Sequence, residues 1–223
     1  MDFRLTDMTD EEIAQDLSVV EPLTDSVRDL IDAVIRTEVD AEHLIAAREQ
    51  IEAVVASLRA EQKPGSYGVP FTKKLHGMPY GNAAVGKRNA IAPPLEIEHQ
   101  ADGSATSKVV LGAAYEGPAG LVHGGISAML LDQLLGEAVS RQHGIPCFTG
   151  TLTMTYLRPT PLGALRLRAE TTGNSGRKYF VRAEICDADG PTVTAEAIMV
   201  APANFPRHEE LQRLRAQLAE APE

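Results

Sequence analysis

Residues 124–141 constrain the fold more than any other part of the sequence, because they predict a helix that is apolar on nearly every side. Its large apolar residues leave no wide polar face: Ile126, Met129, Leu130, Leu131, Leu134, Leu135 and Val139. A helix that is hydrophobic all round must be buried on most of its sides. The rest of the chain therefore has to wrap around this helix. One acid, Asp132, stands inside the apolar run.

The segments on either side of this helix have the period of two that is typical of strands. Two short runs precede the helix, at 95–98 and 104–111, and four follow it, at 151–156, 165–170, 179–185 and 192–200. Connections rich in Gly, Asn and Asp predict hairpin turns at 172–176 and 187–190. Two strands, one helix and a four-stranded meander predict an α+β fold, in which a curled antiparallel sheet surrounds one long central helix.

The first quarter of the chain predicts helices. Thr9 and Glu12 have the spacing of a capping box, which predicts a short helix that begins there. A longer amphipathic stretch follows Thr24, and its apolar residues recur at helical spacing as far as Leu58. The pattern fits a solvated helical pair that packs one apolar stripe, and it also fits a coiled-coil or partner-binding arm.

Composition changes along the chain in a way that predicts four parts. We expect an acidic helical extension at 1–62, a connecting segment rich in Gly and Pro at 63–94, the domain with the central helix at 95–206, and a C-terminal helix or tail at 207–223. Residues 1–60 contain 15 Asp and Glu against five Lys and Arg, so the net charge of −10 belongs to the extension. The other residues carry 16 of each sign and can hold a phosphorylated small molecule.

Charge, cysteine content and hydropathy exclude several classes of protein. The acidic chain lacks the basic face that nucleic-acid binding requires. Two Cys make no disulfide framework, and the acidic start lacks the layout of a signal peptide. No apolar run approaches the roughly 20 residues that span a bilayer. We therefore expect a cytoplasmic protein with no nucleic-acid partner and no membrane span.

Two local motifs favour no catalytic role. Residues 81–88 nearly match a phosphate-binding loop, but Arg88 stands where a Ser or Thr hydroxyl must bind Mg²⁺. Cys147 and His143 are four residues apart, a spacing that does not supply the geometry of a nucleophile pair, and we expect an inert, buried Cys147. The six His show no metal-ligand spacing, so no metal site is predicted.

The start of the central helix has the features of a site for a developing negative charge. Gly117, Gly120, Gly124 and Gly125 let a ligand approach the backbone closely. The first N–H groups of a helix have no intrahelical partner and carry the positive end of its dipole, so they stabilise an oxygen that gains negative charge. Asp132 lies on roughly the same face but about 10 Å further along the axis. If both groups act on one carbonyl, this spacing favours an Asp132 from a second subunit.

Several motifs occur together in this part of the chain. His123-Gly124-Gly125 is followed after six residues by Asp132, and the further motifs are Gly136, the run from Thr149 to Arg158-Pro159, and Gly176-Arg177-Lys178. An HGG motif with this acid spacing, at the head of an apolar helix, is fairly specific. On these motifs, residues 115–202 resemble an acyl-CoA thioesterase of the hotdog superfamily, of the phenylacetate-pathway and thioesterase-superfamily-member type. Residues 1–90 lie outside the resemblance.

The resemblance implies a hotdog fold, a homodimer or dimer of dimers, and an active site at the dimer interface. It implies that the N–H of Gly124 binds the thioester oxygen. Asp132 of the opposite subunit would act as a general base on water or as a nucleophile. Thr149 would help to orient the water or the acid, and His123 would mainly brace the loop. Members often carry an Asn six residues before the His, and Gly117 stands at that position here.

The implied substrate is an acyl-CoA, in lipid metabolism, with no separate cofactor. CoA phosphates need cations. Arg158, Arg177 and Lys178 are candidates because strand ends and turns expose them, and Gly125 is a candidate because it lies at the helix start. These four residues are therefore the predicted ligand-binding positions.

Two other functions are compatible with the same fold. A non-catalytic module would bind an acyl-CoA or a lipid without turnover, and the ligand would stabilise it without thiol release. A hotdog dehydratase or hydratase usually needs a His–acid pair, and His123 is the only His near the helix start. The sequence favours a hydrolase that cleaves acyl-CoA thioesters with Asp132 and Gly124.

Overall fold

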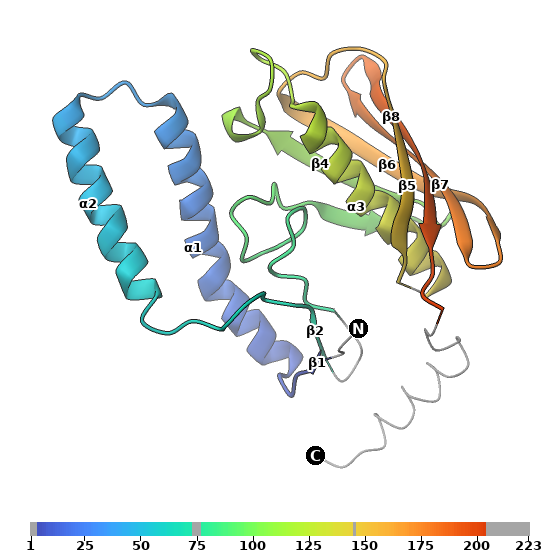
Figure 1. Ribbon diagram of the computed structural model, residues 1–223, viewed down its shortest axis with the longest axis horizontal. Helices are drawn as coiled ribbons and strands as arrows, with labels where there is room; N and C mark the ends of the chain where they lie inside the picture. Colours follow the sequence, from blue (N-terminus) through green and yellow to red (C-terminus); the bar gives the residue numbers. More distant parts are fainter. Residues whose placement is uncertain (1–3, 73–76, 145, 204–223) are drawn as a thin grey trace.

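The main body of the protein is a sheet that curls around one helix (Figure 1). The computed structural model describes residues 4–72, 77–144 and 146–203. Within these residues, the sheet has six antiparallel strands in the order β3-β4-β6-β7-β8-β5. Their bounds are β3 Glu96–His99, β4 Ala105–Leu111, β5 Phe148–Tyr156, β6 Gly163–Ser175, β7 Lys178–Asp187 and β8 Gly190–Val200. Helix α3, Gly124–His143, packs against the sheet, which confirms the predicted α+β hotdog arrangement.

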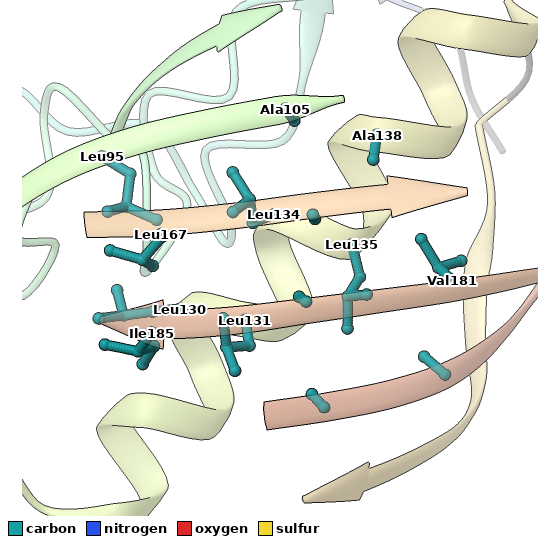
Figure 2. Close-up of a cluster of buried hydrophobic side chains, with 14 of the residues drawn as sticks. Leu95, Ala105, Leu130, Leu131, Leu134, Leu135, Ala138, Leu167, Val181 and Ile185 are labelled. Carbon is teal, nitrogen blue, oxygen red and sulfur yellow. The ribbon is translucent and has the colours of Figure 1, made fainter. Parts of the chain in front are cut away.

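The core lies between α3 and the inner face of the sheet (Figure 2). Six residues of the helix have no exposed surface: Leu130, Leu131, Leu134, Leu135, Ala138 and Val139. They meet alternate residues of the strands, among them Leu167, Val181 and Ile185. Each buried leucine of this kind contributes about 1.5–3 kcal/mol of transfer free energy. The helix ends at His143, and the next residue, Gly144, caps it with a φ of 66°, the left-handed conformation that favours glycine.

The two predicted hairpins are present, but β6, the first strand of the first hairpin, is longer than the composition of residues 172–176 indicated. β6 continues through Ser175, which pairs with Lys178, so the turn contains only residues 176 and 177. Gly176 has a φ of 58°, the conformation that a two-residue hairpin turn requires. The polar residues at 172–175 therefore belong to a strand end. The second hairpin pairs Asp187 with Gly190, as expected.

The N-terminal part forms two helices, α1 at Asp10–Arg36 and α2 at Ala41–Leu58. The predicted capping box at Thr9 is present. The prediction of a short helix followed by a separate one was wrong, because α1 continues through Pro22. The buried Thr24 shows that the packed face of the helix extends beyond the proline. α2 has no buried residue.

α1 is attached to the segment that nearly matches a phosphate-binding loop. Lys87 Nζ lies 2.5 Å from the Glu21 carboxylate, and Arg88 lies 2.7 Å from Asp16. Arg28 donates to the Ala92 carbonyl over 3.0 Å. The cations of this segment therefore pair with acids of α1.

The remaining elements are short. β1, Arg4–Leu5, pairs in parallel with β2, Pro70–Phe71, and a 3-10 turn, η1, covers Ala113–Tyr115. Helices in the described part of the chain are too short or too polar to cross a membrane. The predicted helix or tail at 207–223 lies outside the described residues, and the division into four parts stays a prediction.

Candidate active site

Among the described residues, the N-terminus of α3 leaves one main-chain N–H without a protein partner. His123 is the N-cap, and its Nδ1 accepts a hydrogen bond from the Gly125 N–H over 3.0 Å. The Ile126 and Ser127 N–H groups donate to the His123 carbonyl over 2.9 and 3.2 Å. Within the described residues, the Gly124 N–H has no protein partner. It can therefore donate to an external acceptor at the positive end of the helix dipole.

The loop that leads into α3 is fixed by its own hydrogen bonds. The Gly120 N–H donates to the Glu116 carboxylate over 2.6 Å, and the Gly117 N–H donates to the Leu121 carbonyl over 2.9 Å. The Val122 N–H donates to the Thr160 carbonyl over 2.9 Å, which anchors the loop beyond the end of β5. These bonds hold the N-cap in place.

Gly117 leaves no room for a side chain. A Cβ at this position would lie 2.8 Å from the Cα of His123, a backbone atom that cannot move aside. The Asn that the resemblance implies at this position would therefore not fit this loop. The main-chain N–H of Gly124 is left as the donor at the helix start.

Asp132 lies on the side of α3 that faces the sheet edge. The Thr149 hydroxyl donates to its Oδ1 over 2.6 Å. Asp132 is half-buried, and Thr149 is exposed. The predicted pairing of an acid with a hydroxyl that orients it is thus present in the geometry, and their catalytic roles stay a prediction.

A β-bulge turns Thr149 toward the helix. The pairing of β5 with β8 shifts register between Thr149 and Thr151, which leaves Gly150 unpaired. A Cβ at Gly150 would lie 3.1 Å from the Ile198 carbonyl, so the bulge suits glycine. Without the extra residue, Thr149 would lie with Thr151 and Thr153 on the outer face. The bulge therefore places the hydroxyl beside Asp132.

The free N–H and the carboxylate do not meet within one chain. Gly124 and Asp132 are separated by eight positions on one helix, which corresponds to about 12 Å. Two hollows of about 640 and 560 Å³ lie on the outer face of the sheet, and neither is lined by Gly124 or Asp132. The geometry of one chain therefore gives two half-sites, one at the start of α3 and one at Asp132.

Both half-sites are in contact with β5. Thr149 near its start contacts Asp132, and the hydroxyl of Tyr156 at its end donates to the Gly124 carbonyl over 2.9 Å. β5 is an edge strand, so one row of its main-chain groups faces outward. Phe148 and Tyr156 have 56% and 54% of their surface exposed, which is high for large aromatic residues. The edge is therefore open and partly apolar.

The predicted phosphate ligands differ in availability. Arg158 donates to both carboxylate oxygens of Asp187, over 2.6 and 2.5 Å, and to the Gly190 carbonyl. This guanidinium holds the pKa of Asp187 at about 2. Arg177 donates to the Ala201 carbonyl, and Lys178 is exposed at the start of β7. A phosphate at Arg158 would have to compete with a carboxylate.

Two other reactive side chains, Cys147 and His143, are shielded by burial. Cys147 is half-buried, and burial raises the pKa of its thiol to about 11. His143 packs against the ring of Tyr179 with 4.7 Å between centroids, and burial lowers its pKa. No three His, Cys, Asp or Glu side chains in the described part of the chain are grouped as metal ligands.

The sequence did not indicate two features of the site. Tyr156 was noted only as the end of an alternating strand, and the bulge at Gly150 was not expected. The one available signal is that strict alternation from Thr151 conflicts with a functional Thr149, because both would lie on the outer face of the sheet, away from the helix.

Comparison with known proteins places this geometry in a family. The sequence model of the thioesterase superfamily matches residues 119–194. A thioesterase superfamily protein of known crystal structure is 33% identical, with a TM-score of 0.74 over 82% of this chain and 90% of that protein. A phenylacetic acid degradation-related protein from Ralstonia eutropha JMP134 is 28% identical, with a TM-score of 0.45 over 48% of this chain and 84% of its own. A hypothetical thioesterase with coenzyme A from Streptococcus pneumoniae is 22% identical, with a TM-score of 0.46 over 51% of this chain and 90% of its own.

Proposed function

The chain belongs to the thioesterase superfamily, and from this premise we propose that it hydrolyses acyl-CoA thioesters to free CoA and a carboxylic acid. The observation that carries the proposal is the free Gly124 N–H at the start of α3, together with a carboxylate, Asp132, that Thr149 orients. These are an electrophilic donor and a base, which are the two groups that thioester hydrolysis needs.

The Gly124 N–H polarises the thioester carbonyl. As the acyl carbon becomes tetrahedral, negative charge develops on the carbonyl oxygen. A main-chain donor at a helix N-terminus is already oriented toward that oxygen and stabilises the charge. His123 braces this donor, because its Nδ1 accepts from the next N–H along the helix.

Asp132 promotes attack on the acyl carbon in one of two ways. As a general base it takes a proton from water while the water oxygen bonds to the acyl carbon; the C–S bond then breaks, and CoA leaves as a thiolate. As a nucleophile its own oxygen bonds to the acyl carbon and releases the thiolate, and water then hydrolyses the acyl–Asp intermediate. A thiolate is a good leaving group, so neither route needs a strong general acid. Neither route needs a cofactor.

A homodimer would bring the two half-sites together. If β5 pairs with β5 of a second copy about a two-fold axis, the strands run antiparallel and the start of one lies beside the end of the other. The Thr149–Asp132 pair of one protomer would then approach the Tyr156–Gly124 pair of its partner. The open edge of β5 supports this pairing, and two such dimers could associate further.

The CoA phosphates would bind near the cationic turn between β6 and β7. Lys178 pairs with Val200, which pairs in turn with Phe148, so this turn lies at the same end of the sheet as Thr149. Arg177 and Lys178 of the subunit that supplies Asp132 are therefore the better candidates, and Arg158 is the weaker one.

We also propose that the reaction takes place in the cytoplasm.

The experiment measures thiol release from a panel of acyl-CoAs of increasing chain length. The wild type should release CoA from at least one of them, and Asp132→Asn and Asp132→Ala should abolish turnover while the fold is retained. Full activity of Asp132→Ala would refute the mechanism. Thermal stabilisation by acyl-CoA without any thiol release would instead identify a binding module.

A further inference from the structure

Tyr156 packs directly on the first turn of α3, although it belongs to β5. Its hydroxyl donates to the Gly124 carbonyl over 2.9 Å. A Cβ at Gly124 would lie 3.2 Å from the hydroxyl oxygen and 3.3 Å from two ring carbons, a tighter approach than most real Cβ atoms make. The absence of a side chain at 124 therefore allows the ring to reach the helix backbone.

The peptide unit between Gly124 and Gly125 is held at both of its polar ends. Its carbonyl accepts from Tyr156, and its N–H donates to His123 Nδ1 over 3.0 Å. The neighbouring peptide unit, between His123 and Gly124, carries the free N–H. Only the Cα of Gly124 separates the two units, so fixing one restricts the orientation of the other.

External support is needed at this point because two glycines are poor helix formers. Each glycine inside a helix costs about 1 kcal/mol relative to alanine, since it loses more backbone freedom. Without the bonds from Tyr156 and to His123, the first turn would unwind more easily, and the hydrogen bonds from Ile126 and Ser127 to the His123 carbonyl would break. The N–H of Gly124 would then lose its fixed direction.

We propose that Tyr156 is a positioning residue, which holds the Gly124–Gly125 peptide so that the adjacent Gly124 N–H points at the substrate oxygen. This inference rests on the proposed function, because that N–H matters only if it binds a developing oxyanion. In this role Tyr156 acts through the backbone, by the bond of its hydroxyl to the Gly124 carbonyl.

The kinetic test is Tyr156→Phe, which removes the hydroxyl and keeps the ring. One hydrogen bond is worth about 1 kcal/mol, so kcat should fall about fivefold to tenfold. KM should change less than about twofold, because the donor is needed most when charge develops on the oxygen. The matched control is Tyr115→Phe, which removes a hydroxyl that donates to the Ile91 carbonyl over 3.0 Å, and its kcat should stay at the wild-type value. A wild-type kcat in Tyr156→Phe, or a loss confined to KM, would overturn the proposal.

A second measurement separates this inference from the proposed function. Hydrogen exchange of the Gly125 amide, followed by NMR on the full chain, should be several-fold faster in Tyr156→Phe and unchanged in Tyr115→Phe. This readout needs no turnover, so it decides the positioning role even if no acyl-CoA is hydrolysed. An unchanged Gly125 exchange rate in Tyr156→Phe would refute the proposed positioning role of Tyr156. Tyr156 is 54% exposed and Phe keeps its ring, so the variant should fold.

Discussion

Gly124→Pro is the most direct way to remove the proposed oxyanion donor. Proline lacks a main-chain N–H, and position 124 is the first residue of α3, where proline is favoured in helices. His123 has φ −61° and ψ 131°, the extended conformation that a residue before proline prefers. The substitution therefore deletes one donor and keeps the helix, apart from a shift of a few tenths of an ångström at the Tyr156 ring.

The expected loss follows from the role of a single oxyanion donor. Removal of one such donor typically lowers kcat by about 10²–10³, which corresponds to about 2.7–4 kcal/mol. The measurement is steady-state thiol release from the best acyl-CoA, with the fold checked by circular dichroism. Ala41→Pro is the matched control, because it places proline at the first position of α2 after Asp40, which has φ −67° and ψ 170°. The control should keep wild-type kcat.

Mixing two inactive variants tests whether the site is shared between subunits. When Gly124→Pro and Asp132→Asn chains are unfolded together and refolded, half of the dimers are mixed. Each mixed dimer has one site with an intact Gly124 and an intact partner Asp132. About a quarter of the wild-type activity should return, as two-fold symmetry requires. No recovery in verified mixed dimers, or wild-type kcat in Gly124→Pro alone, would refute the reasoning.

Three further results are expected. Thr149→Val removes the hydroxyl bonded to Asp132 over 2.6 Å and should lower kcat about tenfold with little change in KM, as steady-state kinetics would show. Gly117→Ala places a Cβ 2.8 Å from a backbone atom and should lower the free energy of unfolding in urea by about 1–3 kcal/mol; an unchanged midpoint would contradict the clash. Arg158 holds the pKa of Asp187 at about 2, below its usual 3.8, so this pair stabilises the fold above pH 3.8 and the contribution disappears as pH falls through 2. Asp187→Asn should therefore lose less stability than the wild type between these two pH values. The free energy of unfolding in urea, measured at several pH values, would check this, and the same pH dependence in both proteins would contradict it.

The sequence predicted the fold well because one helix dominates it. An apolar helix such as the one that contains Leu130 to Leu135 must be buried on most sides. The alternating segments predicted the strands that bury it. The prediction of a short helix followed by a separate stretch was wrong, because α1 continues through Pro22 and its packed face extends past the proline. The residues at 172–175 misled the turn prediction for the same reason, since strand pairing outweighs loop-like composition.

The site was predictable to the extent that its chemistry lies in short motifs. The HGG motif and the spacing to Asp132 indicated the two half-sites, and the distance along the helix already implied that they are separate. Tyr156 could not be predicted, because its role depends on how a strand crosses a helix. Thr149 came from the family resemblance alone: strict alternation places it on the outer face, and only the bulge at Gly150 reverses this.

The burial of α3 itself limits where a site can form in this protein. A helix enclosed on most sides can present polar groups to a ligand only at its N-terminus and along the narrow face beside the open sheet edge. Gly124 occupies the first place and Asp132 the second, and both lie against β5. The open edge strand β5 therefore contacts both half-sites. Pairing of this edge with a second copy would bring the two half-sites together into one active site. For this reason we expect a proline at a position of β5 whose N–H faces away from β8, such as Met154→Pro, to abolish turnover and dimerisation together; an active monomer would show that the site is complete within one chain.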